Sequence, residues 1–351
     1  MREVAVISFA QLPIVRREDE RDDIEMVLPV VTEALRASGL EKRQVGFTVS
    51  GSSDFLTGRP FSFVMALDAV GAWPPIEESH VEMDGAWALY EAWVRLQHGD
   101  IDAALVYCFG KSSAGDLRDV LVMQLDPYCT APLWPDSVSL AALQARALLD
   151  TGRATERDLA AIVSARRSAA KKNPYAQLKG DYGVDALLEA PRFVAPLRKH
   201  DCPPISDGAA AMVLATGDLA RKVCSRPAFI RGIDHRIEPH ALGSRDLTRS
   251  SSTSLAAEKA GALSGTFDCA EIHAPFSHQE LILQEALKLT NGTEVNLSGG
   301  ALCGNPMMVA GLTRIGEAAL RIHRGEAKRA LAHATSGPCL QQNLVCVLEA
   351  G

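Results

Sequence analysis

A segment near the end of the first quarter of the chain, HVEMDGAWALYEAWVRLQHGD at positions 80–100, has the pattern of a strand that turns directly into a helix. Apolar residues from Ala86 to Trp93 recur at helical spacing after the turn. In α/β enzymes such a turn often carries a nucleophile, because the amides at a helix N-terminus stabilise negative charge. Here the turn offers only Asp84 and Gly85, so it contains no group that can attack a substrate.

Other side chains of reactive type lie in the last quarter of the chain: His273, His278, Cys303, Asn305 and Cys339. A histidine can transfer a proton near neutral pH, a thiolate can attack a carbonyl, and an asparagine amide can donate a hydrogen bond to a developing oxyanion. Isolated residues of these types are most often buried and structural. A role in chemistry therefore depends on a fold that brings them together.

The composition sets limits on the class of protein. The chain has 351 residues, 47% hydrophobic and 23% charged, which is typical of a globular protein with one large domain or two ordinary ones. A net charge of −7 with only short basic clusters argues against nucleic acid as a partner. No segment is long and apolar enough for a signal peptide or a membrane span, so we expect a cytoplasmic protein.

The cysteine pattern favours reduced thiols. Eight cysteines are scattered along the chain without a C-x-x-C pair, so neither a zinc site nor a disulfide framework is expected. No metal and no bound cofactor is predicted.

Strand-like runs alternate with helical stretches, which predicts an α/β fold. The predicted strands are Glu3–Phe9, Ala103–Phe109, Ala211–Ala215, Ala228–Arg231, Ala330–Ala334 and Leu344–Leu348.

The chain contains an internal repeat. A shift of 226 positions lays DGAWALYEAWVRLQHGDIDAAL over AGLTRIGEAALRIHRGEAKRAL, with seven identical pairs and no gap. The repeated unit is a turn, a helix, a glycine stop and a strand. We therefore predict two duplicated α/β halves, residues 1–225 and 226–351, with a long loop insertion in the first half at about 110–200.

Four segments carry a resemblance to the thiolase superfamily, and together they cover essentially the whole chain. Residues 173–216 end in SDGAAA, and residues 271–287 (EIHAPFSHQELILQEAL) resemble the H-D-x-F-x-x-x-E segment of the sterol-carrier-protein type. Residues 296–311 resemble the G-G-x-x-x-G-H-P loop, and residues 333–349 the closing strand pair. The chain also resembles bacterial lipid-transfer thiolase-like proteins of steroid side-chain degradation. The resemblance implies the thiolase fold, a layered α/β/α/β/α structure.

The resemblance also implies where catalytic groups belong, and most of those positions are changed. The nucleophilic cysteine falls on Gly85, which keeps a backbone amide as an oxyanion donor but has no thiol. The histidine of the G-H-P loop falls on Asn305, which can donate a hydrogen bond but cannot shuttle a proton. The second cysteine falls near Gly337, with Cys339 two residues away. Only the histidine of the H-D-x-F segment is kept, as His273.

Two further residues have an open role. Cys303 adjoins the Asn305 loop and is expected to face the same cavity, although a small buried thiol is the ordinary interpretation. His278 is either structural or part of the site.

The missing cysteine closes the route to Claisen condensation and thiolysis. A retro-aldol cleavage needs no acyl-enzyme, only a base and donors for the developing thioester enolate. Three hypotheses follow: cleavage of a C–C bond in a bulky acyl-CoA with His273 as base, a catalytically silent subunit that partners an active paralogue, and a lipid or acyl-CoA carrier. The related aldolases carry tyrosines where this chain has His273 and the Gly337–Cys339 loop, so the mechanism need not be the same.

The resemblance finally implies partners. The substrate would be a coenzyme A thioester, and the chain would pair with itself or with a thiolase-like paralogue through strands of the first half, as a dimer or tetramer. A small OB-fold and zinc-ribbon protein that assists acyl-CoA binding is a further expected partner.

Overall fold

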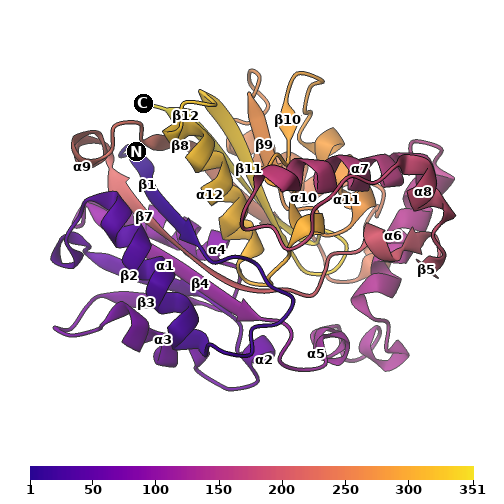
Figure 1. The fold of residues 1–351 in the computed structure, drawn as a ribbon, viewed down its shortest axis with the longest axis horizontal. Helices are drawn as coiled ribbons and strands as arrows, with labels where there is room; N and C mark the ends of the chain where they lie inside the picture. The colour runs from indigo at the N-terminus through magenta and orange to yellow at the C-terminus, as the bar shows by residue number, and fades with distance from the viewer.

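The computed structural model describes residues 1–351, and a ten-stranded sheet runs through both halves of the chain (Figure 1). The strand order is β10-β9-β11-β12-β8-β1-β7-β4-β2-β3. The strands are β1 (Val4–Gln11), β2 (Phe47–Gly51), β3 (Glu78–Val81), β4 (Ala103–Lys111), β7 (Asp207–Thr216), β8 (Ala228–Ile237), β9 (Cys269–Ile272), β10 (Glu294–Val295), β11 (Arg329–Ser336) and β12 (Gln342–Ala350). A separate hairpin pairs β5 (Arg192–Val194) with β6 (Leu197–Arg198).

The sheet consists of two five-stranded halves with the same topology. From its outer edge inward, the first half runs β3-β2-β4-β7-β1 and the second runs β10-β9-β11-β12-β8. In each half the three outer strands are parallel and the next two pairings are antiparallel. The halves join where β1 pairs with β8. Each strand predicted from the sequence overlaps an observed one, while the boundary between residues 225 and 226 stays a prediction.

Helices cover the outer faces of the two sheet halves, and two further helices are packed between them. They are α1 (Asp23–Ser38), α2 (Asp54–Thr57), α3 (Ser62–Val70), α4 (Gly85–His98), α5 (Leu117–Met123), α6 (Ser137–Asp150), α7 (Glu156–Ala169), α8 (Val184–Glu189), α9 (Gly217–Val223), α10 (Ser251–Lys259), α11 (Ser277–Ala286) and α12 (Ala310–His323). Short 3-10 helices are η1 (Lys42–Gln44), η2 (Ala131–Leu133), η3 (Ala170–Lys172), η4 (Lys199–Asp201), η5 (Leu242–Ser244) and η6 (Ala301–Cys303).

The layers follow from the alternation of side chains along each strand. On β1, Val4 and Val6 pack in the central cluster with α4 and α12, whereas Ala5 and Ile7 pack on the other face with α1 and α3. In the second half, α10 and α11 cover the outer face of β9, β11 and β12. The predicted α/β/α/β/α arrangement is confirmed.

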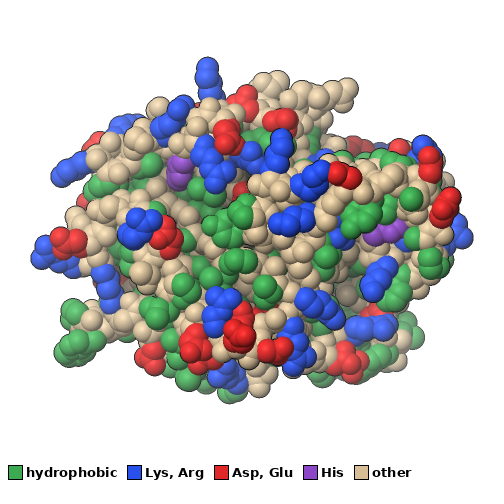
Figure 2. Space-filling model, viewed as in Figure 1, with side chains coloured by type: hydrophobic (Ala, Val, Ile, Leu, Met, Phe, Trp, Pro, Cys, Tyr) green, Lys and Arg blue, Asp and Glu red, His purple; other side chains and the backbone are tan.

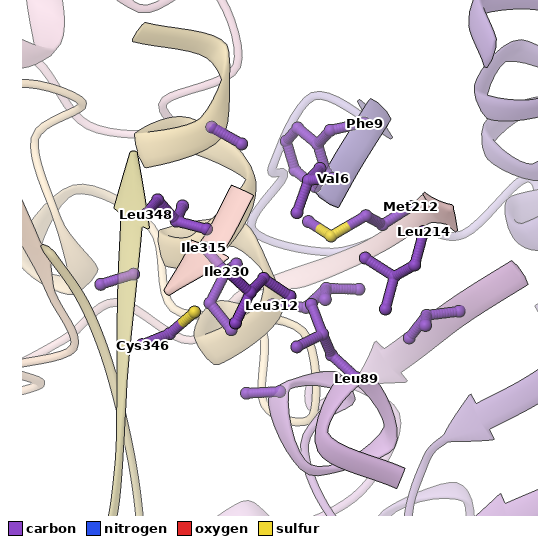
Figure 3. Packing of buried hydrophobic residues seen from close by; sticks show 14 of the residues in the cluster. Val6, Phe9, Leu89, Met212, Leu214, Ile230, Leu312, Ile315, Cys346 and Leu348 are labelled. Carbon is purple, nitrogen blue, oxygen red and sulfur yellow. The ribbon is translucent and has the colours of Figure 1, made fainter. Parts of the chain in front are cut away.

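The two helices of the sequence repeat, α4 and α12, form the middle layer. Leu89 of α4 and Leu312 and Ile315 of α12 meet side chains from both sheet halves in the central cluster (Figure 3). Each helix is followed at its C-terminal end by a glycine in the left-handed conformation, Gly99 with φ 96° and Gly325 with φ 75°. The repeat detected in the sequence is thus the pair of helices that the whole molecule packs around.

The halves differ mainly in one connection. Residues 112–206 link β4 to β7 and contain α5 to α8, whereas residues 337–341 make the corresponding link between β11 and β12. The long connection covers the region, about 110–200, for which the repeat predicted an insertion, and the division into domains stays a prediction. None of the helices has the length and apolar character needed to cross a membrane.

Candidate active site

Asp84, the residue at the strand-to-helix turn, joins the N-termini of α4 and α12. Its carboxylate accepts hydrogen bonds from the backbone N–H groups of Ala86 at 2.9 Å, Gly311 at 2.9 Å and Leu312 at 3.0 Å. The side chain is buried, which raises the pKa of Asp84, while the three amides and Arg314 act in the opposite direction. Asp84 is therefore a cap shared by two helices, and its oxygens are not free to react with a substrate.

The position predicted for the missing nucleophile, Gly85, has no room for a side chain. A Cβ atom there would lie 2.7 Å from Cys108 Sγ, 2.8 Å from Cys108 Cβ and 3.0 Å from Leu312 Cβ. Contacts this short force neighbouring atoms to move. The sulfur of Cys108, from the adjacent strand β4, fills the volume into which a side chain at Gly85 would project.

The backbone amide of Gly85 was predicted as an oxyanion donor, and in the structure it already has a partner. It donates to the carbonyl of Met308 at 2.9 Å, in the turn that leads into α12. Met308 adopts a left-handed conformation with φ 69°, which is unfavourable for a residue with a side chain. The Gly85 amide is thus occupied, and we do not include it among the donors of the site.

His273 and Asn305 are brought together, as the sequence predicted for a shared site. His273 follows β9, and its Nε2 lies 2.9 Å from Asn305 Oδ1. Its Nδ1 accepts from the backbone N–H of Thr335 on β11 at 3.3 Å. Burial lowers the pKa of His273 to about 4. The expectation of a histidine that titrates near neutral pH is therefore wrong, because removal from water disfavours the imidazolium ion.

Asn305 lies in the loop between η6 and α12. Its backbone N–H donates to Ser206 Oγ at 3.0 Å, and Ser206 is buried at the start of β7. Its side-chain oxygen is engaged by His273, whereas the side-chain nitrogen Nδ2 has no hydrogen-bond acceptor in the chain. Asn305 is only partly buried, so Nδ2 is the donor of this pair that remains open to a ligand.

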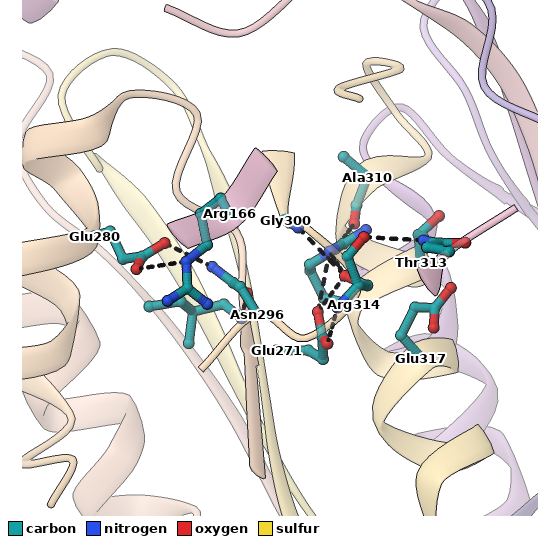
Figure 4. A network of polar contacts seen from close by, with 12 residues as sticks. Arg166, Glu271, Glu280, Asn296, Gly300, Ala310, Thr313, Arg314 and Glu317 are labelled. Carbon is teal, nitrogen blue, oxygen red and sulfur yellow. Dashed lines mark hydrogen bonds and ion pairs between the residues drawn. The ribbon is translucent and has the colours of Figure 1, made fainter. Parts of the chain in front are cut away.

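A buried ionic network supports the loop that carries Asn305 (Figure 4). Glu271 on β9 and Arg314 on α12 form an ion pair at 3.1 Å, with both side chains almost fully buried. Ser298 completes it, because its N–H and hydroxyl donate to the Glu271 carboxylate at 2.9 and 2.6 Å. Removing one partner from such a pair leaves an uncompensated buried charge. The network therefore fixes strand, helix and loop relative to one another directly beside the His273–Asn305 pair.

A second buried group holds the same loop from the other side of β9. Asn296 accepts from the N–H of Ile272 at 2.7 Å and donates to the carboxylate of Glu280 at 2.9 Å. Arg166 of the insertion approaches Glu280 at 3.4 Å (Figure 4). The oxygen of the Asn296 amide thus ties the loop before Asn305 to the segment before His273, and its nitrogen ties the same loop to α11.

The two candidate cysteines lie in apolar surroundings rather than beside the pair. Cys303 packs against Ala170 and Ala176 of the insertion, and burial raises its pKa to about 11. Cys339 packs with Val122, Leu125 and Leu140, donates its thiol hydrogen to Leu140 O at 3.4 Å, and also has a pKa raised to about 11 by burial. Neither thiol is ionised at neutral pH.

His278, the remaining candidate, is a buried residue of α11. Its Nε2 lies 3.2 Å from Gln144 Oε1 on the insertion helix α6, and burial lowers its pKa to about 3. It joins the insertion to the second half, and the structure does not bring it together with His273 and Asn305 through any hydrogen bond. No three His, Cys, Asp or Glu side chains lie close enough together to hold a metal ion.

Cys108 and Thr335 were not predicted from the sequence to contact the site residues. Cys108 is brought to Gly85 by the packing of β4 against α4, and Thr335 reaches His273 through its backbone, so its side-chain type carries no signal. Ala103–Phe109 was predicted as a strand from a continuous apolar run, but which face of the sheet Cys108 lies on depends on the strand register.

On the face seen in Figure 2, Lys and Arg side chains are interspersed with Asp and Glu.

The chain is similar to several known proteins. No protein-family model matches the chain. The chain is 28% identical over 360 residues to an acetyl-CoA acetyltransferase of Methanothermobacter thermautotrophicus, covering 93% of this chain and 92% of that protein. It is 25% identical over 354 residues to the benzoylsuccinyl-CoA thiolase subunit BbsB of Thauera aromatica, covering 89% of each. It is also 27% identical over 183 residues to sterol carrier protein 2 of Bos taurus, covering 44% of this chain and 34% of that protein.

The fold agrees with these sequence similarities. A solved structure of the Ltp2-ChsH2(DUF35) aldolase superimposes with a TM-score of 0.81, covering 99% of this chain and 98% of that chain at 18% identity. An identity this low shows the fold alone. With two duplicated sheet halves around α4 and α12, and with acetyl-CoA acetyltransferase and thiolase relatives along almost its whole length, the chain is a thiolase-superfamily protein, part of which is similar to sterol carrier protein 2.

Proposed function

We propose that the chain is a thiolase-like subunit that binds a bulky acyl-CoA, with a steroid side chain as one such acyl group, and takes part in retro-aldol cleavage of a C–C bond within a hetero-oligomer. The observation that carries the proposal is the combination of a closed nucleophile position at Gly85 with an open donor at Asn305 Nδ2. Acyl transfer needs a nucleophile at the position of Gly85, whereas polarisation of a thioester carbonyl needs only a hydrogen-bond donor such as Asn305 Nδ2.

The chemistry requires no covalent intermediate. A base removes the proton of a β-hydroxyl group, the hydroxyl oxygen becomes a carbonyl, and the bond between the α and β carbons breaks. The electron pair of that bond moves into the thioester as an enolate, which is then protonated at the α carbon. A hydrogen bond from Asn305 Nδ2 to the thioester oxygen stabilises the enolate, and one such donor is worth about 10²–10³ in rate.

His273 is not the base in this proposal. Its Nδ1 lone pair accepts the Thr335 N–H and its Nε2 faces Asn305, so neither nitrogen is free to accept a substrate proton. Burial lowers its pKa to about 4, which makes it a weak base. The base would come from a group outside this pair, on this chain or on a partner.

That conclusion favours a second candidate, the catalytically silent subunit. If the base and the acyl-CoA site both belong to an active paralogue, the His273–Asn305 pair has only a structural role here. The name of the solved aldolase with the same fold, Ltp2-ChsH2(DUF35), contains two components, which supports a search for a partner in either case.

The experiment is turnover by the reconstituted complex. A 3-hydroxyacyl-CoA with a bulky branched or cyclic acyl group is incubated with the chain alone, and with the chain plus the proteins encoded beside it. We expect a carbonyl compound and the shortened acyl-CoA from the complex, and a loss of at least 10²-fold in Asn305→Ala. Full activity in Asn305→Ala, with activity abolished by substitutions in the partner, would establish the silent subunit instead.

A further inference from the structure

We infer that His273 is a positioning residue: the backbone amide of Thr335 fixes the ring tautomer of His273, and His273 in turn fixes the side-chain amide of Asn305 so that its Nδ2 group faces the ligand. This inference rests on the proposed function, because it assigns the role of one residue in the site that would bind the thioester.

The tautomer follows from what a backbone N–H can do. The Thr335 amide can only donate, so the nitrogen that receives it, His273 Nδ1, must carry a lone pair. A neutral imidazole has its proton on the other nitrogen, which is Nε2. The Thr335 amide does not move easily, since β11 is paired with β12 at this residue and the Thr335 hydroxyl also donates to Gln342 O at 3.1 Å.

The orientation of Asn305 follows from the tautomer. His273 Nε2–H is a donor, so the atom of Asn305 that faces it at 2.9 Å must be the oxygen. If the amide were reversed, two N–H groups would oppose each other in a buried contact. The Asn305 NH₂ group is therefore turned away from His273, and the bond from the Asn305 N–H to Ser206 Oγ at 3.0 Å holds the backbone of the residue in place.

This arrangement explains the presence of a histidine that stays neutral near pH 7. Burial holds the ring neutral, since its pKa is lowered to about 4, and a neutral ring has one donor and one acceptor on opposite sides. A neutral ring can therefore accept a hydrogen bond from the fixed Thr335 backbone amide and donate one to the rotatable side-chain amide of Asn305. An ionised ring would have two donors and would oppose the Thr335 N–H.

The substitutions that test this are His273→Gln and His273→Leu. Glutamine places an NH₂ donor near the position of Nε2 and can still donate to Asn305 Oδ1, but it cannot act as a base. Leucine fills the volume and donates nothing. The matched controls are His278→Gln and His278→Leu, at a buried histidine that also lies 3.2 Å from an amide oxygen but outside the pair.

The first readout is binding of hexanoyl-CoA and of S-hexyl-CoA, a thioether that lacks the carbonyl oxygen, by calorimetry. The hydrogen bond from Asn305 is expected to give the thioester an advantage of about five- to tenfold over the thioether. The wild-type chain and His273→Gln should keep this advantage, and His273→Leu should lose it while still binding both ligands. An advantage that persists in His273→Leu, or that is lost equally in both variants, would overturn the inference.

The second readout needs neither ligand nor variant. In protein labelled with ¹⁵N-histidine, the ring nitrogens of His273 should show a protonated Nε2 and an unprotonated Nδ1 throughout pH 5–8. A protonated Nδ1, or titration near pH 6.5, would overturn the inference even if both CoA compounds bind. If neither compound binds, the proposed function fails, and the ring tautomer still decides whether Asn305 is oriented by His273.

Discussion

Asp84 and Gly311 lie 227 residues apart in sequence, and the Asp84 carboxylate accepts the Gly311 N–H at 2.9 Å. Gly311 is the counterpart of Gly85 in the sequence repeat, and a Cβ atom on it would lie 2.4 Å from Asp84 Oδ1. The return contact runs from the Gly85 N–H to Met308 O. The N-termini of the two central helices are therefore bonded to each other in both directions, at the turn where related enzymes place a nucleophile.

Replacing Asp84 by alanine should destabilise the protein strongly. Three buried N–H groups on two helices would lose their acceptor, and each unsatisfied donor costs about 1–3 kcal/mol. We expect the free energy of unfolding, measured with denaturant, to fall by about 3 kcal/mol or more. The control is Asp22→Ala, the exposed cap of α1, where loss of one such bond should cost about 1 kcal/mol. Equal losses in the two variants would contradict a shared cap.

A thermodynamic cycle tests whether Cys108 closes the position at Gly85. Gly85→Ala alone should lower the free energy of unfolding by about 1–3 kcal/mol, because the new methyl group meets Cys108 Sγ at 2.7 Å. In a background of Cys108→Gly the same change should cost less, so the two substitutions should show a favourable coupling energy of at least about 1 kcal/mol. A coupling energy near zero would show that Leu312 or the backbone sets the limit instead.

Stability should fall in mild acid because three buried histidines stay neutral in the folded protein. Burial lowers the pKa of His273 to about 4 and those of His278 and His333 to about 3. The unfolded chain binds protons on these residues below about pH 6.5, whereas the folded chain does not. Their contribution to stability is therefore complete above about pH 6.5 and is lost as the pH falls toward 4.

The measurement is the slope of unfolding free energy against pH between 6 and 4.5. Each histidine contributes up to about 1.4 kcal/mol per pH unit, so His278→Gln should reduce the slope by nearly that amount. The control His98→Gln, at a side chain that is 78% exposed, should leave it unchanged. An unaltered slope in His278→Gln would show that this histidine is protonated in the folded state.

The fold was largely predictable because its signals are local. Runs of apolar residues predicted the strands that form the two halves, and the repeat predicted α4 and α12 with their glycine stops at Gly99 and Gly325. Short strands without a continuous apolar pattern, such as β2 and β9, were not predicted. They form because neighbouring strands and helices bury them from both sides.

The site was predictable only as a set of positions. The sequence brought His273 and Asn305 together by resemblance, but it did not indicate that His273 is buried and neutral or that Met308 occupies the Gly85 amide. Burial and hydrogen-bond partners depend on contacts between segments far apart in the chain. The same holds for Cys108, whose sulfur reaches Gly85 only through strand register.

The outer edge of the first half should take part in assembly. Strand β3 is the edge strand of the sheet. Helix α3 packs against it through Phe63, whose ring stacks on that of His80 with 4.4 Å between the ring centroids. The same helix exposes Val64 and Met65. We expect an oligomer by sedimentation velocity, and dissociation in Val64→Lys. Ile237→Lys, at an exposed apolar residue where β8 ends, is the matched control and should not dissociate. A monomer at micromolar concentration, unchanged by proteins encoded beside the chain, would contradict this expectation.

This thiolase-type chain should be unable to form an acyl-enzyme, because Cys108 closes the nucleophile position at Gly85 and burial raises the pKa values of the Cys108, Cys303 and Cys339 thiols. The most direct test is the intact mass of the protein after incubation with acetyl-CoA or acetoacetyl-CoA at neutral pH, alone and in its complex. We expect this chain to gain no acyl mass. An acyl group found on Cys108, Cys303 or Cys339 that is released again by free coenzyme A would contradict it.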